Sequence, residues 1–336
     1  MVQTQGDQSG MTVAVTGASG FVGRYVVREL LSRGHRVRGL TRSHEKAREK
    51  LPTDDERLTI VAGDALESGV LDALYDGADA GVHLIGIIRE APGGQTFRKV
   101  HVETTKAVLK AAKKAGAKRH VQMSAIGADV EGKTEYWRTK GGIERMVRGS
   151  GLDWTIFRPG LIHGPDSEMM QMAKGWVTGR SMPWVVLPYF TRLAEWPPPL
   201  LPPAPPKLVG PEIEPVHVSD VANAFVTALG CKASIGEIYH LCGPERMTWP
   251  ELLTFVRDRV PTARKWLRPV GLPQPIGQAQ AVAWMLSGLK HAMPFDYGMA
   301  TMAGQDVVAD TTKARRDLGM RFESFSETAA EYVPTM

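Results

Sequence analysis

The sequence predicts an α/β fold with a doubly wound parallel sheet and a smaller C-terminal subdomain. Short apolar runs rich in β-branched residues alternate with helical stretches through the first half of the 336-residue chain. A glycine-rich turn joins the first apolar run to the first helical stretch. Strands joined by helices of this length form right-handed βαβ units, and such units build a parallel sheet.

The expected elements follow one another from residue 11 to residue 157. Strands are predicted at residues 11–15, 36–40, 58–62, 80–85, 120–124 and 153–157. Helices are predicted at residues 21–32, 44–51, 69–75, 96–115 and 135–148. Gly34 and Gly116 follow two of these helices, as glycine commonly does where a helix ends.

Composition excludes several classes of protein. The net charge is only +5, and the one basic cluster (residues 110–119) lies on a predicted helix and its exit, so we predict no nucleic-acid binding. No apolar run reaches about 18 residues, so no transmembrane helix is expected. Cys231 and Cys242 form no metal-ligand pattern, so we predict no metal site, and they suit a reduced, cytoplasmic location.

The turn Thr16-Gly-Ala-Ser-Gly-Phe-Val-Gly23 has the features of a phosphate-binding loop. Gly17 permits a sharp turn, Gly20 allows the backbone to approach a pyrophosphate, and Gly23 allows the helix to lie close to the sheet. The following helix would present free N–H groups to phosphate. A tight turn without a ligand is the alternative, but the position after the first strand favours dinucleotide binding.

The G-x-x-G-x-x-G spacing of TGASGFVG resembles the short-chain dehydrogenase/reductase superfamily, whose members have a Rossmann fold. The resemblance covers the first 165 residues and continues more weakly to about residue 245. Residues 157–165 and 215–222 resemble segments of two-domain, atypical members. These include NAD(P)-binding proteins similar to the accessory subunit of respiratory complex I, and NmrA-like regulators.

The resemblance implies the domain boundaries. We expect a disordered lead-in over residues 1–10, without the apolar core of a signal peptide, and a dinucleotide-binding domain over 11–165. Residues 166–336 would form the C-terminal substrate subdomain, of which about 213–245 returns to the Rossmann core.

The resemblance also implies a nicotinamide cofactor site. The expected contacts lie in the glycine turn, just after the strands, or on the helix at 135–148: Thr16, Gly17, Ser19, Gly20, Phe21, Val22, Gly23, Arg42, Ser43, Asp64, Ala65, Leu84, Gly86, Lys140, Pro159, Gly160, Leu161 and Ile162. No acidic residue directly follows the second strand, whereas Arg42 and Ser43 could bind a 2′-phosphate. We therefore predict NADP rather than NAD, with a solvated loop arginine as the alternative for Arg42.

Tyr136 and Lys140 lie one helical turn apart and so share a face of their helix. By the resemblance, the Tyr136 hydroxyl exchanges a proton with the substrate, and Lys140 lowers the tyrosine pKa and binds the nicotinamide ribose. Ser124, at the end of the fifth strand, would polarise the substrate carbonyl. Two departures stand out: Ala125 replaces a second hydroxyl, and His101 occupies a position where the family often has asparagine. We assign His101 no catalytic role.

The C-terminal half is less informative. Residues 169–193 are rich in Met, Trp and other apolar residues, and they could form a lid over an apolar substrate, a membrane or partner surface, or the core of the subdomain, which we favour. Residues 195–206 predict a polyproline connector, and residues 278–290 an amphipathic helix.

Together these features predict an NAD(P)-dependent oxidoreductase. It would transfer hydride between NADP(H) and the carbonyl or alcohol carbon of a small organic substrate, which could be apolar. Two alternatives remain open: a non-catalytic NAD(P)H-binding accessory or redox-sensor protein, and a sugar-nucleotide epimerase or dehydratase. The protein is expected to be a monomer or homodimer, and peripheral membrane contact remains open.

Overall fold

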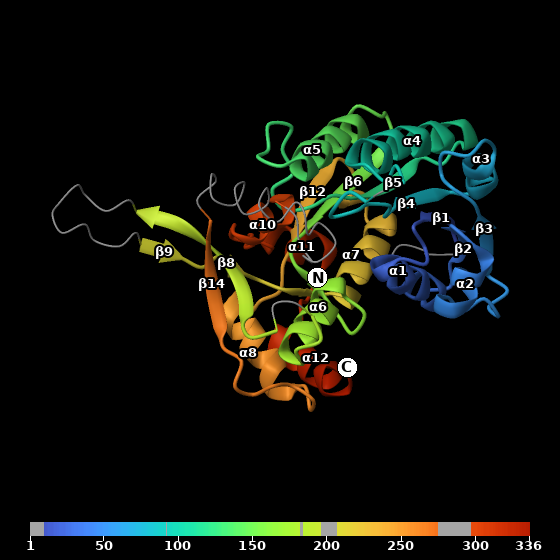
Figure 1. Ribbon diagram of the computed structural model, residues 1–336. Coiled ribbons are helices and arrows are strands. Elements are labelled where there is room, and N and C mark those ends of the chain that lie inside the picture. The colour runs from blue at the N-terminus through green and yellow to red at the C-terminus, as the bar shows by residue number, and fades with distance from the viewer. Residues whose placement is uncertain (1–9, 92, 182–183, 196–206, 275–296) are drawn as a thin grey trace. The chain divides into compact units, whose positions relative to one another are not determined.

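The computed structural model describes residues 10–91, 93–181, 184–195, 207–274 and 297–336 (Figure 1). The chain forms two compact units. The first contains the chain up to Pro159 together with 218–241 and 310–322, and the second contains 160–217, 242–309 and 323–336. The predicted polyproline connector and the predicted helix at 278–290 lie outside the described residues, apart from Glu195.

A seven-stranded parallel sheet forms the first unit, which confirms the predicted fold class. Its strands are β1 (Thr12–Thr16), β2 (Arg36–Thr41), β3 (Leu58–Ala62), β4 (Ala80–His83), β5 (Arg119–Met123), β6 (Asp153–Pro159) and β12 (Glu237–Leu241). Their order is β12-β6-β5-β4-β1-β2-β3, so the winding direction reverses between β1 and β4. Ligands of open α/β sheets bind at this kind of switch point, beyond the carboxyl ends of the strands.

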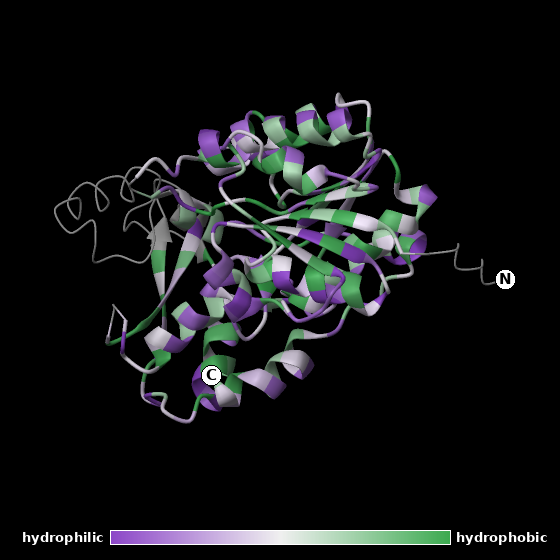
Figure 2. Cartoon of the chain, turned by 90° about the vertical axis from the view of Figure 1, so that its right-hand side faces the viewer, coloured by the Kyte–Doolittle hydropathy of each residue, from purple (hydrophilic) through white to green (hydrophobic). Residues whose placement is uncertain are grey.

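Helices cover both faces of this sheet. They are α1 (Phe21–Ser32), α2 (His44–Lys50), α3 (Val70–Tyr75), η1 (Arg98–Glu103), α4 (Thr104–Ala115), α5 (Glu135–Arg148), α7 (Val218–Gly230), η2 (Lys232–Ser234) and α11 (Thr312–Leu318). Figure 1 shows α4 and α5 over one face, with α1 and α7 on the other. Hydrophobic residues run along the strands between these layers, while hydrophilic residues mark the outer helical surfaces (Figure 2).

The predicted helix at 96–115 differs from the observed one in its first turns. Residues Arg98–Glu103 form a π-helical segment, and the α-helix proper begins at Thr104. Hydrophobic periodicity cannot distinguish these two windings over so few residues. The wider turn matters because it contains His101, which is fully buried.

A buried arginine joins separate segments of the first unit. Arg119 on β5 donates hydrogen bonds to the Asp153 carbonyl (2.6 Å), the Thr155 hydroxyl (2.6 Å), the Ala228 carbonyl (2.7 Å) and the Ser234 hydroxyl (2.8 Å). Burial lowers the pKa of its guanidinium to about 10. These bonds tie β6, α7 and η2 to β5.

The second unit is mixed α and β. Its elements are β7 (Ile162–His163), α6 (Glu168–Val177), β8 (Leu187–Glu195), β9 (Lys207–Val209), β10 (Glu212–Ile213), β11 (Val216–His217), β13 (Met247–Thr248), α8 (Trp249–Arg259), β14 (Pro269–Gln274), α10 (Tyr297–Ala303), α12 (Phe325–Tyr332) and η4 (Val333–Thr335). Met170, Trp176 and Leu187 are buried in its core, as the favoured interpretation of the Met- and Trp-rich stretch predicts. Trp184 is a clear exception because it is exposed.

No helix within the described part of the chain combines the length and the apolarity needed to cross a membrane.

Two adjacent glycines of α5 face different surroundings. A Cβ atom on Gly141 would lie 2.4 Å from the backbone carbonyl carbon of Asp129 and 2.4 Å from the Val130 nitrogen. A Cβ atom on Gly142 would meet nothing within 4 Å. Gly141 therefore allows α5 to lie directly against the loop that follows β5.

We predict opposite effects for alanine at these two sites. Gly141→Ala should lower the free energy of unfolding by about 1–3 kcal/mol, because backbone atoms must move to admit the methyl group. Gly142→Ala should raise it by about 0.5–1 kcal/mol, because alanine favours the helix. Urea unfolding followed by circular dichroism measures both changes, and equal effects would contradict the close contact.

Candidate active site

The glycine turn between β1 and α1 has the geometry that a pyrophosphate requires. Gly17 has a φ of 70°, and a Cβ atom on Gly23 would lie 2.0 Å from the Gly17 carbonyl oxygen. Gly20 precedes α1, and no side chain caps the first turn of this helix. The N–H groups at that end therefore point out of the turn without a side-chain acceptor, so this cradle fits a dinucleotide phosphate.

Thr16 connects this turn to the loop after β4. Its hydroxyl oxygen accepts a hydrogen bond from the Leu84 N–H at 3.2 Å and lies 2.6 Å from His83 Nδ1. The other His83 nitrogen lies 3.1 Å from the Thr105 hydroxyl. Burial, with nearby basic groups, holds the pKa of His83 well below its ordinary value, so the imidazole is neutral. Thr16 thus connects the end of β1 to His83 and Leu84 at the switch point, where the winding direction of the sheet reverses.

Arg42 and Ser43, the residues predicted to favour NADP over NAD, directly precede α2, and Asp64, another predicted cofactor contact, lies between β3 and α3. Arg42 is exposed and forms no hydrogen bond or ion pair with the described residues. The Ser43 hydroxyl accepts a hydrogen bond from the Lys46 N–H at 3.2 Å and caps α2. Asp64 is exposed and accepts a bond from the Leu66 N–H at 2.8 Å, within a turn. Only Arg42 therefore has its whole side chain available for a 2′-phosphate.

The remaining predicted cofactor residues fall into two groups. Ser19, Phe21, Val22 and Leu84 are half-buried, and Ala65 and Pro159 are buried, all in the first unit. Gly160, Leu161 and Ile162 belong to the second unit, where Val216 donates a backbone bond to Leu161 and β7 pairs with β11. Their contact with a cofactor stays a prediction.

Lys140 is a buried cation beside the loop that follows β4 and contains Gly86 and Ile87, which we call the cofactor loop. Its side chain is 3% exposed, and a Cβ atom on Gly86 would lie only 3.3 Å from Nζ. Among the residues that the structure describes, none forms a hydrogen bond or ion pair with this ammonium. Burial lowers the pKa of Lys140 to about 8, while Glu144 one turn away opposes the shift. The missing side chain of Gly86 thus allows the loop after β4 to pass close to Nζ.

Tyr136 lies beside this cation in an aromatic setting. The Lys140 nitrogen is 5.8 Å from the centre of the tyrosine ring, and Phe97 and His101 contact the ring edge-on. Removal from water raises the pKa of Tyr136 to about 12. Burial is the cause of this shift, and the phenol keeps its proton at neutral pH.

His101 is the residue whose importance the sequence did not reveal. Its Nε2 lies 3.1 Å from both the backbone nitrogen and the carbonyl oxygen of Ile87, and its Nδ1 lies 2.9 Å from the Thr139 hydroxyl. Burial and the Lys140 charge lower the pKa of His101 to about 3. A neutral imidazole thus links the cofactor loop to α5 and packs against Tyr136. Its partners are distant in sequence, so no local spacing could have indicated them.

Ser124 has a different environment from the one predicted. Its hydroxyl donates a short hydrogen bond to Glu144, whose carboxylate also accepts two bonds from Arg158, at 2.8 and 2.6 Å. Because a serine hydroxyl has one proton, Ser124 must turn away from Glu144 before it can polarise a carbonyl. Its catalytic role stays a prediction.

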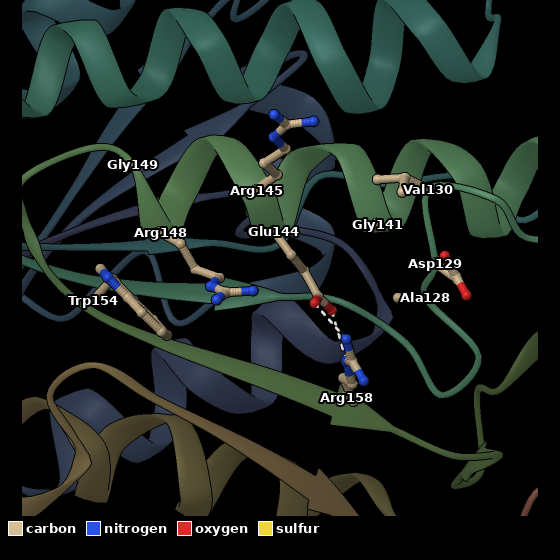
Figure 3. A pocket seen from close by; sticks show the side chains of 10 residues that line it. All are labelled: Ala128, Asp129, Val130, Gly141, Glu144, Arg145, Arg148, Gly149, Trp154 and Arg158. Carbon is tan, nitrogen blue, oxygen red and sulfur yellow. Dashed lines mark hydrogen bonds and ion pairs between the residues drawn. The ribbon is translucent and has the colours of Figure 1, made fainter.

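The Glu144–Arg158 ion pair lies in a pocket of about 920 Å³ (Figure 3). Glu144 and Arg158 point toward each other across it, and Arg148 extends into the same space. The pocket is lined by Ala128, Asp129, Val130, Gly141, Glu144, Arg145, Arg148, Gly149, Trp154 and Arg158. It opens beside α5 and β6, within the first unit.

Comparison with known proteins supports a nicotinamide-binding assignment. Residues 17–178 match a family model described as NAD(P)H-binding. The chain is 29% identical over 279 residues to subunit 9 of the mitochondrial NADH dehydrogenase [ubiquinone] 1 alpha subcomplex of Arabidopsis thaliana, covering 81% of this chain and 63% of that protein. It therefore spans less than two thirds of that relative.

Two further proteins extend the comparison. A ceramide reductase of Caulobacter vibrioides is 32% identical over 247 residues, covering 72% of this chain and 68% of that protein. A dTDP-glucose 4,6-dehydratase double mutant of Streptomyces venezuelae, solved with NAD, has a TM-score of 0.68 at 24% identity, covering 96% and 95% of the two chains. The last likeness concerns the fold alone.

The burial of Lys140 predicts a pH-dependent stability effect. Below pH 8 the ammonium is charged in both the folded and the unfolded state. The whole cost of removing this charge from water then lowers the free energy of unfolding. Between pH 8 and about 10.5 only the folded state loses the proton, and stability should rise. Lys140→Met should therefore stabilise the protein by roughly 1–3 kcal/mol at pH 7, with the difference vanishing above about pH 10.5.

Urea unfolding at several pH values measures this difference. Lys110→Met, on the exposed face of α4, is the matched control and should leave the pH dependence unchanged. A Lys140→Met variant less stable than the parent at pH 7 would contradict a destabilising buried charge.

Proposed function

Because the chain belongs to the NAD(P)-binding short-chain dehydrogenase/reductase superfamily, we propose that it is an NADP(H)-dependent oxidoreductase acting on a carbonyl or alcohol of a small organic substrate. One observation carries the proposal most. Lys140 is a buried ammonium without a hydrogen-bonding partner in the described chain, one turn from Tyr136 and next to the loop at Gly86. An ammonium with so little exposure to water would be stabilised by hydrogen-bond acceptors of a ligand.

The pKa values favour reduction of a carbonyl. Tyr136, with a pKa of about 12, holds a proton that it can donate to the oxygen of a carbonyl as that oxygen gains negative charge. Lys140, with a pKa of about 8, is mostly protonated at pH 7 and stabilises the negative charge left on the phenolate. A nicotinamide cofactor, when bound, supplies the hydride.

His101 supports this arrangement as a positioning residue. Its bonds to Ile87 and Thr139 hold the cofactor loop and α5 at a fixed spacing, and its ring packs on Tyr136. Since the imidazole is neutral, it adds no positive charge beside Lys140.

An accessory role without chemistry is the second candidate. The hydrogen bond from Ser124 to Glu144 favours it, because it occupies the hydroxyl proton that should polarise a substrate. The Arabidopsis relative is named as a subunit of a larger complex, which agrees with such a role. A bound dinucleotide would then stabilise the fold or report the redox state to a partner.

The cofactor preference can be tested by calorimetric titration of cofactor-free protein with NADPH and NADH. We expect tighter binding of NADPH, with Arg42→Ala weakening NADPH roughly 10-fold or more and leaving NADH unchanged, because a 2′-phosphate loses a charged partner. Arg48→Ala, at an exposed position of α2, is the control. Preferential NADH binding would refute the NADP assignment.

Catalysis can be tested with Tyr136→Phe. NADPH oxidation is followed by absorbance with a panel of carbonyl compounds that includes ceramide-like lipids, because the Caulobacter relative is named a ceramide reductase. The variant should lose about 10²–10⁴-fold in turnover while keeping its affinity for NADPH, because only the proton donor is removed. Phe97→Leu, in contact with the ring, is the packing control and should retain most activity.

Two results would decide against the enzyme. Turnover unaffected by Tyr136→Phe would remove Tyr136 from the mechanism. NADPH binding without turnover of any carbonyl compound in the panel would favour the accessory role.

A further inference from the structure

Exposed hydrophobic side chains gather on two segments of the second unit. Among the described residues, eight large hydrophobic side chains are exposed, and four of them lie at 184–185 and 266–270. These four are Trp184 (53% exposed), Val185 (64%), Trp266 (57%) and Val270 (39%). The other four are spread over the first unit. We call Trp184, Val185, Trp266 and Val270 the tryptophan patch.

The sheet of the second unit brings the two segments together. β8 and β14 are parallel neighbours in which Leu187 pairs with Pro269. Each tryptophan stands three residues before its strand's paired residue. The Leu187 N–H donates to the Arg268 carbonyl at 3.0 Å, and an Arg264 nitrogen lies 3.5 Å from the Trp184 carbonyl. Both tryptophans therefore lie at the same end of this sheet.

Packing does not explain why these side chains face outward. Leu187 and Leu267, in the same segments, are fully buried, and Trp176 is buried in the same unit. The core of this unit thus accepts large apolar side chains from neighbouring positions. Two indoles more than half exposed in one place mark a surface used for contact.

Positive charge borders the tryptophan patch. Arg264, Lys265 and Arg268 are exposed, and their side chains donate to backbone carbonyls. None of the three forms an ion pair with a carboxylate in the described part of the chain. A surface that combines exposed indoles with unneutralised cations is complementary to anionic headgroups above an apolar layer.

We propose that the tryptophan patch docks on the surface of an anionic lipid bilayer. The indoles of Trp184 and Trp266 enter the interfacial region of the bilayer, and Val185 and Val270 contact its apolar layer. Arg264 and Arg268 contact the lipid phosphates. Lys265, whose ammonium donates its three protons to the Arg257, Asp258 and Val260 carbonyls, adds positive charge beside them. This inference is independent of the proposed catalysis, because it requires neither a cofactor nor turnover.

Vesicle flotation of the full chain tests the proposal. Vesicles of phosphatidylcholine alone are compared with vesicles that also contain phosphatidylglycerol, at low and high salt. We expect binding to the anionic vesicles that weakens with salt. A Trp184→Ser/Trp266→Ser double variant should bind at least 10-fold more weakly. Arg268→Gln should weaken binding to anionic vesicles about fivefold, the effect of one cation near such a surface.

Matched controls separate docking from misfolding. Ile88→Ser/Val130→Ser replaces exposed apolar residues of the first unit and should bind vesicles as the parent does. All variants should retain the parent's far-ultraviolet circular dichroism and unfolding midpoint. A parent chain that ignores anionic vesicles, or a double variant that binds like the parent, would overturn the proposal. So would a double variant that changes oligomeric state without lipid, since the patch would then join copies of the chain.

Discussion

The first unit depends on one buried guanidinium. The chain leaves this unit after Pro159 and returns at Val218, and Arg119 bonds to carbonyl and hydroxyl oxygens on both sides of that excursion. The three acceptors, on Asp153, Ala228 and Ser234, lie in separate segments, so loss of the guanidinium would remove one hydrogen bond from each of these segments. The sheet edge formed by β6 and β12 is thereby completed by a segment that is distant in sequence. The carboxyl end of the sheet, where the cofactor is predicted to bind, depends on these strands being held together.

Burial decides which basic side chains of the candidate site carry a charge. Three basic side chains, His83, His101 and Lys140, are buried near one another at the carboxyl end of the sheet. Desolvation keeps both imidazoles neutral, which leaves Lys140 as the one of the three that carries charge at neutral pH. A neutral histidine can hold the loop at Ile87 without repelling that charge. In the proposed reaction the charged Lys140 would act on the ligand, while the two neutral histidines hold the surrounding backbone in place.

The sequence allowed the sheet and the helices to be predicted because period and turn signals are local. The helices at 21–32 and 135–148 were predicted with their observed bounds, and the latter places Tyr136 and Lys140 on one face. The bond from Ser124 to Glu144 and the bridge made by His101 join separate elements, and no spacing along the chain encodes them. Trp184 was expected in a core because composition cannot tell which large residue of an apolar stretch faces outward.

The unpartnered Lys140 has a consequence outside the reaction. A fold that contains a desolvated charge is less stable alone than with a ligand that accepts its hydrogen bonds, and binding to the folded state shifts the folding equilibrium in proportion to ligand concentration. Transient opening exposes a chain to proteases, and cellular abundance follows the population of the open form. With the proposed dinucleotide as that ligand, the nicotinamide pool would set how long each copy of the protein survives.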